Sequence, residues 1–149
     1  MRNTVTAVAV PAAALLALAG HLFAGGFWLQ LGNPDASAEA RKNNAVLTIK
    51  AVGCHDPATA QVTATAIGMV DGHRQSIPLK LTKLSETGIF ALSQQWPKQG
   101  RWVIELVGRN PDQFTNTLVP ANPDGVDRVH AKADIKQFGD RDVAAMLQD

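Results

Sequence analysis

The sequence predicts an all-β protein: a single antiparallel β-sandwich of about seven strands, with an apolar helix before it and a short helix after it. Three observations predict this fold class. The chain begins with a charge-free apolar run, apolar and polar residues alternate after residue 44, and turn residues recur about every 8–12 residues. We therefore expect an export signal or membrane anchor over 1–31, a linker over 32–44, the sandwich over 45–138 and a helix over 139–149.

The N-terminal run has the layout of an export signal. No charged side chain occurs from Val5 to Leu31, and Arg2 gives the segment a positive start that stays in the cytoplasm. We therefore expect the domain to be exported, to the periplasm or to the extracellular space.

Two fates of this run remain open. The small residues of Ala17-Leu18-Ala19 or of Ala36-Ser37-Ala38 would suit cleavage. Retention as a membrane helix would also suit, because the run exceeds the about 20 residues that span a bilayer. Phe27 and Trp28 would then lie at the far interface, and the polar stretch with Asn33-Pro34-Asp35 would be a linker.

Alternation of period two predicts the strands, since each strand then has one buried and one wet face. Turn residues separate the runs, and Asp71-Gly72 is typical of a tight hairpin. Pro78 lacks an N–H, so its strand is expected at an edge or with a bulge. Short strands at this spacing favour an immunoglobulin-like sandwich. The predicted inward positions are Leu47, Ile49, Ala51, Val62, Ala64, Ala66, Ile77, Leu79, Leu81, Phe90, Leu92, Trp96, Trp102, Ile104, Leu106, Phe114, Leu118, Val129, Ala131, Ala133 and Ile135.

A short helix is predicted after Gly139. Asp140 is expected to cap it, and Asp142 suits the positive end of the helix. Val143, Met146 and Leu147 fall on one face, which has to dock on the sandwich for so short a helix to be stable.

Charge and cysteine content narrow the function classes. The chain has 14 Lys+Arg against 13 Asp+Glu, without a basic cluster, so we expect no nucleic-acid partner. The single cysteine, Cys54, excludes an internal disulfide. Catalytic, nucleotide-binding and dinucleotide-binding signatures are absent from the sequence, and we predict no enzymatic activity and no resident cofactor.

Cys54 and His55 are the most reactive pair in the sequence. A thiolate beside an imidazole can bind a soft metal such as Cu(I) or act as a nucleophile, and Met69 could add a ligand if the fold brings it close. The alternatives are a partly buried thiol beside a surface histidine, or pairing of Cys54 with another chain. We interpret His73 and His130 as solvated surface residues.

Trp96 and Trp102 enclose one turn, Pro97-Lys98-Gln99-Gly100-Arg101. We interpret them as two core side chains on paired strands. The alternative is an exposed aromatic platform that contacts a carbohydrate or a protein partner.

A resemblance rests on Gly88-Ile89-Phe90-Ala91-Leu92, Trp96-Pro97 and the run from Gly100 to Leu106. This strand–turn–strand resembles exported immunoglobulin-like families, namely the YtkA-like and FixH-like domains and the carboxypeptidase regulatory-like domains. The resemblance covers about 20 residues. It implies a sandwich of the cell envelope that assists or binds rather than catalyses. The His- and Met-rich segments of the copper-handling relatives are missing from this sequence.

The leading hypothesis is therefore a non-enzymatic module of the cell envelope that mediates protein contacts or assists an envelope complex. It contacts the membrane through its N-terminal segment if that segment is retained. The alternatives are a copper-binding accessory protein that uses Cys54 and His55, and a carbohydrate-binding module that uses Trp96 or Trp102.

Overall fold

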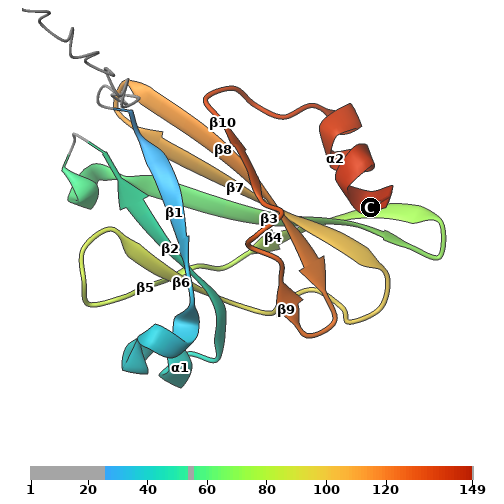
Figure 1. Ribbon diagram of the computed structural model, residues 1–149, viewed down its shortest axis with the longest axis horizontal. Coiled ribbons are helices and arrows are strands. Elements are labelled where there is room, and N and C mark those ends of the chain that lie inside the picture. Colours follow the sequence, from blue (N-terminus) through green and yellow to red (C-terminus); the bar gives the residue numbers. More distant parts are fainter. Residues whose placement is uncertain (1–25, 54–55, 149) are drawn as a thin grey trace, which may run out of the picture.

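The structure, a computed structural model, describes residues 26–53 and 56–148 and contains two antiparallel β-sheets that enclose one main core (Figure 1). The all-β prediction is confirmed. The first sheet has the strand order β1-β2-β6-β5, with β1 at Trp28–Gly32, β2 at Ala45–Val52, β6 at Ile89–Ser93 and β5 at Thr82–Lys83. The second sheet has the order β10-β8-β7-β3-β4, with β10 at Lys132–Asp134, β8 at Gln113–Asn122, β7 at Arg101–Asn110, β3 at Gln61–Val70 and β4 at His73–Leu79. A short strand β9, Gly125–Val126, also pairs with β8.

The folded domain begins earlier than the sequence predicts. β1 pairs with β2 from Trp28↔Val52 to Gly32↔Thr48, and Phe27 and Leu29 are only 5% and 6% exposed in the main core. The predicted boundary at residue 31 is therefore wrong. Phe27, Leu29 and Leu31 alternate with Trp28 and Gln30, which is the period of a strand inside an apolar run.

The rest of the predicted export segment, residues 5–25, lies outside the described residues. Within the described ranges, no helix combines the length and the apolar character that a membrane crossing requires.

The predicted linker is ordered. It contains a 3₁₀ turn at Pro34–Ala36 and the helix α1 at Ala38–Lys42, whose N-cap Ser37 accepts a hydrogen bond from the Ala40 N–H at 3.1 Å. Ala40 is fully buried. The Glu39 carboxylate accepts hydrogen bonds from the hydroxyl and the N–H of Ser85, which lower the pKa of Glu39.

The predicted hairpin at Asp71-Gly72 is confirmed. Both residues have positive φ, 49° and 78°, as a two-residue type I′ turn requires. In such a hairpin the flanking pair Val70↔His73 is hydrogen-bonded, so every second residue of β4 from Arg74 to Pro78 turns its backbone groups away from β3. Pro78 thus lies on an edge strand, the first of the two predicted alternatives, at a position where its missing N–H costs the sheet nothing.

The two tryptophans are both buried, at 4% and 3% exposure, but not on paired strands. Trp96 follows β6 of the first sheet and Trp102 lies on β7 of the second sheet, because the turn between them carries the chain across the sandwich. The Trp102 indole lies over Gly68 of β3, its cross-strand partner, and donates a hydrogen bond to the Gln99 carbonyl at 2.8 Å.

The C-terminal part confirms one prediction and corrects two. Val143, Met146 and Leu147 of α2, Asp140–Gln148, pack on the outer face of the second sheet, in a cluster with Ile67, Val103 and Leu118. Asp140 is not the cap of this helix: the Gly139 carbonyl accepts the first helical hydrogen bonds, from the N–H groups of Asp142 and Val143. The Gly139 N–H in turn donates a hydrogen bond to the Asp142 carboxylate at 2.8 Å. Val129 and Ile135 are 87% and 75% exposed, because β10 is a three-residue edge strand rather than a full strand over 128–135.

Candidate functional site

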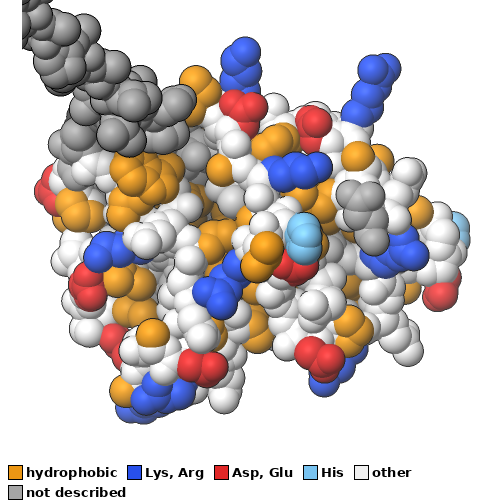
Figure 2. Space-filling view, in the orientation of Figure 1, with side chains coloured by type: hydrophobic (Ala, Val, Ile, Leu, Met, Phe, Trp, Pro, Cys, Tyr) orange, Lys and Arg blue, Asp and Glu red, His pale blue; other side chains and the backbone are white. Residues whose placement is uncertain are grey.

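A groove of about 750 Å³ lies where α2, the end of β8 and the chain between β9 and β10 meet. We call it the α2 groove. Its apolar lining includes Pro120, Ala121, Met146 and Leu147, and its charged lining comes from Arg101, Asp127, His130 and Lys132. Figure 2 views the molecule from the side of β9 and β10, where basic, acidic and histidine side chains gather between apolar ones. A volume of this size is within the range of ligand-binding clefts, about 300–1,000 Å³.

The wall formed by α2 is held at both ends by arginines of the second sheet. Arg101 Nη1 donates hydrogen bonds to the carbonyls of Leu147 at 3.1 Å and Gln148 at 3.2 Å. These last carbonyls have no partner inside the helix, and a cation is favourable at the negative end of the helix dipole. At the other end, Arg74 Nη2 lies 2.9 Å from Asp140 Oδ1. The guanidinium of Arg101 therefore both lines the groove and fixes its wall.

The opposite wall contains a carboxylate and a histidine that are joined by a short hydrogen bond. His130 Nδ1 lies 2.6 Å from Asp127 Oδ2, and Asp127 Oδ1 accepts the backbone N–H groups of Val129 at 3.0 Å and His130 at 3.3 Å. The hydrogen bond from His130 is the main cause that holds the pKa of Asp127 below its ordinary value, and the two backbone bonds act in the same direction. When Nδ1 donates to Asp127, Nε2 of the exposed imidazole is left to bind an acceptor or, in the neutral ring, a donor.

The charge balance in the α2 groove is positive. Arg101 and Lys132 carry fixed positive charges, and the carboxylate of Asp127 is already engaged by His130. Apolar side chains of α2 and β8 lie beside these cations. Such a surface matches a ligand that presents carboxylates next to apolar groups.

Sequence reasoning did not identify the α2 groove. It described His130 as a solvated surface residue, which the structure confirms, but gave no reason to connect it with Arg101, about 29 residues earlier in the chain. The one local signal is Asp127 followed three residues later by His130, a spacing that lets a carboxylate reach both the ring and the backbone of the same turn.

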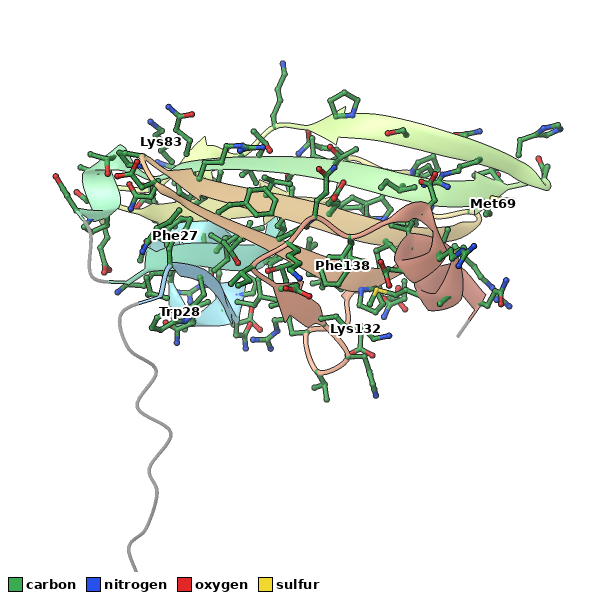
Figure 3. All side chains as sticks on the ribbon, turned by 90° about the horizontal axis from the view of Figure 1, so that it is seen from above. Phe27, Trp28, Met69, Lys83, Lys132 and Phe138 are labelled. Carbon is green, nitrogen blue, oxygen red and sulfur yellow. The ribbon has the colours of Figure 1, made fainter. Side chains whose placement is uncertain are left out.

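Of the three predicted metal ligands, the structure describes only Met69. Cys54 and His55 lie outside the described residues, but the chain resumes at Asp56 and enters β3 at Gln61. Met69 lies eight residues farther along β3, about 26 Å away at 3.3 Å per residue. Figure 3 shows the same separation, with Met69 at the opposite end of the sandwich from Phe27, whose backbone lies against Gly53.

Elsewhere in the described ranges, no three His, Cys, Asp or Glu side chains gather closely enough to hold a metal ion. A role for Cys54 and His55, with Met69, in copper binding stays a prediction.

The exposed aromatic platform is not formed by the predicted residues. Trp96 and Trp102 are both enclosed in the main core, so neither ring can stack on a sugar. Trp28 is the tryptophan with an exposed face, at 46%. The sequence prediction places Trp28 in the export signal or membrane anchor over 1–31.

No protein-family model, no curated protein and no solved structure matches this chain. The arrangement of its residues is therefore the basis for the proposed function.

Proposed function

We propose that this protein is an exported, non-enzymatic module of the cell envelope that binds an acidic, partly apolar segment of a partner protein in the α2 groove. The observation that carries the proposal is the composition of this groove. Two fixed cations and a histidine lie beside an apolar lining, and the only carboxylate among the described lining residues is bound by that histidine.

The strand order supports an immunoglobulin-like module. In that fold, strands A, B, E and D form one sheet and C, F and G the other, and some members extend the second sheet with C′. The order β1-β2-β6-β5 corresponds to A-B-E-D, and β4-β3-β7-β8 corresponds to C′-C-F-G. Domains of this architecture commonly bind partners through the loops and faces around a rigid sandwich.

The apolar N-terminal run supports export. Residues 5–25 contain no charged side chain and follow Arg2, which is the charge distribution of a secretory signal or a membrane anchor. Export would bring the α2 groove to partners in the periplasm or outside the cell.

Site-specific photocrosslinking in the producing cells tests this function. A photoreactive amino acid is placed at Lys132 in the groove, and at Lys83 on β5 as the control. Figure 3 shows these two side chains on different parts of the sandwich. We expect one discrete crosslinked partner from position 132, with the crosslinked peptide rich in Asp and Glu, and none from position 83. A charge-reversing Lys132→Glu variant should abolish co-purification of that partner, whereas Lys83→Glu should not.

Two results would contradict the proposal. One is an identical crosslinking pattern from both positions, which would mean that the groove has no special role. The other is turnover of a substrate by the purified protein, which would remove the non-enzymatic part.

A further inference from the structure

The strand β1 belongs to the folded domain, and this limits where a signal peptidase can cleave the chain. We infer that the domain begins at Phe27 and that processing leaves Gly26 and all later residues in the mature protein. The sequence offered Ala17-Leu18-Ala19 and Ala36-Ser37-Ala38 as cleavage sites, and this inference retains only the first, or an uncleaved anchor. It rests on the proposed export of the chain.

The side chains of β1 fill the main core. Phe27 and Leu29 are 5% and 6% exposed and belong to the same buried cluster as Ile104 and Leu106 of the opposite sheet. Figure 3 shows Phe27 directed into the sandwich, whereas Trp28 points away from it. A cut after Ala38 would therefore remove two core side chains, not a disposable leader.

The opposite sheet is shaped to receive these side chains. A Cβ atom built on Gly108 of β7 would lie 3.0 Å from Phe27 Cε1 and 3.1 Å from Leu29 Cδ2. A glycine at this position leaves the room that Phe27 and Leu29 occupy. Without them, the core would contain a void beside Gly108, which has no side chain of its own to fill it.

The backbone of the first sheet also depends on β1. Five residue pairs join β1 to β2, from Trp28↔Val52 to Gly32↔Thr48. Removal of β1 would turn β2, whose side chains Leu47 and Ile49 are fully buried, into an unprotected edge strand.

The second predicted cleavage site lies inside this ordered segment. Ser37 caps α1 through its bond to the Ala40 N–H, and Ala40 has no exposed surface. A cut there would remove the cap together with β1. The small residues of Ala36-Ser37-Ala38 are explained by the tight 3₁₀ turn and the helix start that they form.

A matched pair of variants in the full chain tests the place of β1. Leu29→Asp introduces a carboxylate at a buried position, and Gln30→Asp introduces the same group at the next, exposed position. We expect Leu29→Asp to abolish the cooperative urea unfolding transition and Gln30→Asp to leave its midpoint unchanged. An export segment that extends to residue 31 predicts equal effects of both variants on export and none on unfolding, and that result would overturn the inference.

The intact mass of the exported protein tests the processing site. We expect an N-terminus at Gly20, after Ala17-Leu18-Ala19, or an unprocessed chain in the membrane fraction, and an Ala38→Gln variant with the same N-terminus as the parent. A mature protein that starts after Phe27 and unfolds cooperatively would overturn the inference. If the chain stays in the cytoplasm, the export proposal fails, while the Leu29 and Gln30 variants still decide whether Phe27–Gly32 belongs to the domain.

Discussion

Gly68→Ala is expected to destabilise the protein through a single, defined contact. Gly68 of β3 lies directly opposite Trp102 of β7, and a Cβ atom built on it would lie 2.4 Å from Cε3, 2.5 Å from Cδ2 and 2.7 Å from Cζ3 of the indole. These distances are about 1 Å shorter than an ordinary carbon–carbon contact of about 3.5–4.0 Å. The ring has to move, or the two strands have to separate.

The indole has little freedom to move. It is 3% exposed in the main core, and its Nε1 donates a hydrogen bond to the Gln99 carbonyl at 2.8 Å. Overpacking of a tight core destabilises a protein by about 1–3 kcal/mol. Replacing glycine by alanine offsets about 0.4–1 kcal/mol of this, because alanine lowers the conformational entropy of the unfolded chain. We therefore expect a net loss of about 1–2 kcal/mol of the free energy of unfolding. This corresponds to a fall in Tm of about 4–8 °C, at about 4 °C per kcal/mol for a domain of this size.

Urea unfolding, followed by circular dichroism, measures this loss as a shift in the midpoint at constant slope. Gly26→Ala is the matched control, because a Cβ atom there has no neighbour within 4 Å. A double-mutant cycle with Trp102→Leu, which removes Cε3 and Cζ3, should recover most of the cost of Gly68→Ala. Equal costs in both backgrounds, or wild-type stability of Gly68→Ala, would refute the packing argument.

Three further predictions concern the α2 groove and the metal hypothesis. Arg101→Gln should lower the stability by about 1 kcal/mol, because the last carbonyls of α2 lose their donor, and hydrogen exchange should accelerate in that helix more than in β7; unchanged protection of the helix would contradict this. His130→Ala should raise the pKa of Asp127 toward its ordinary value of 3.8, measured by carboxyl ¹³C titration. Because the folded-state pKa is lowered, the stabilisation by this pair is present above about pH 4 and is lost as the pH falls through the lowered value. Met69→Leu should leave any Cu(I) binding through Cys54 unchanged in a competition titration under reducing conditions, and a lost copper equivalent would show that the two residues do meet.

The strands and turns were predictable because their causes are local. Alternation marked the inward residues of β2, β3, β6 and β7, and the turn at Asp71-Gly72 followed from its need for two positive φ angles. The docking face of α2 could be predicted in the same way, from the spacing of Val143, Met146 and Leu147. Each of these features depends on residues within about ten positions of one another.

The wrong boundary at residue 31 and the wrong burial predicted for Val129 and Ile135 have the same physical origin. The strand β1 was assigned to the apolar leader because a mean over a long apolar run hides the alternation of Phe27, Leu29 and Leu31. At the other end of the chain, the period-two pattern predicts that Val129 and Ile135 are buried. Both are exposed, because they flank β10, a three-residue strand at the edge of the second sheet. Periodicity shows which side chains could share a face, and it does not show whether another element lies over that face.

The sequence by itself determined the all-β class, the hairpin at Asp71-Gly72, the choice of an edge or a bulge for the strand of Pro78, and the apolar face of α2, because backbone sterics and periodicity act over short distances. Only the tertiary structure decided that Trp96 follows a strand of one sheet while Trp102 lies on a strand of the other, and that Arg101 meets α2 beside His130. These relations depend on which strands pair and in which order. Strand order is set by the packing of the whole core, to which residues as distant as Phe27 and Gly108 contribute together.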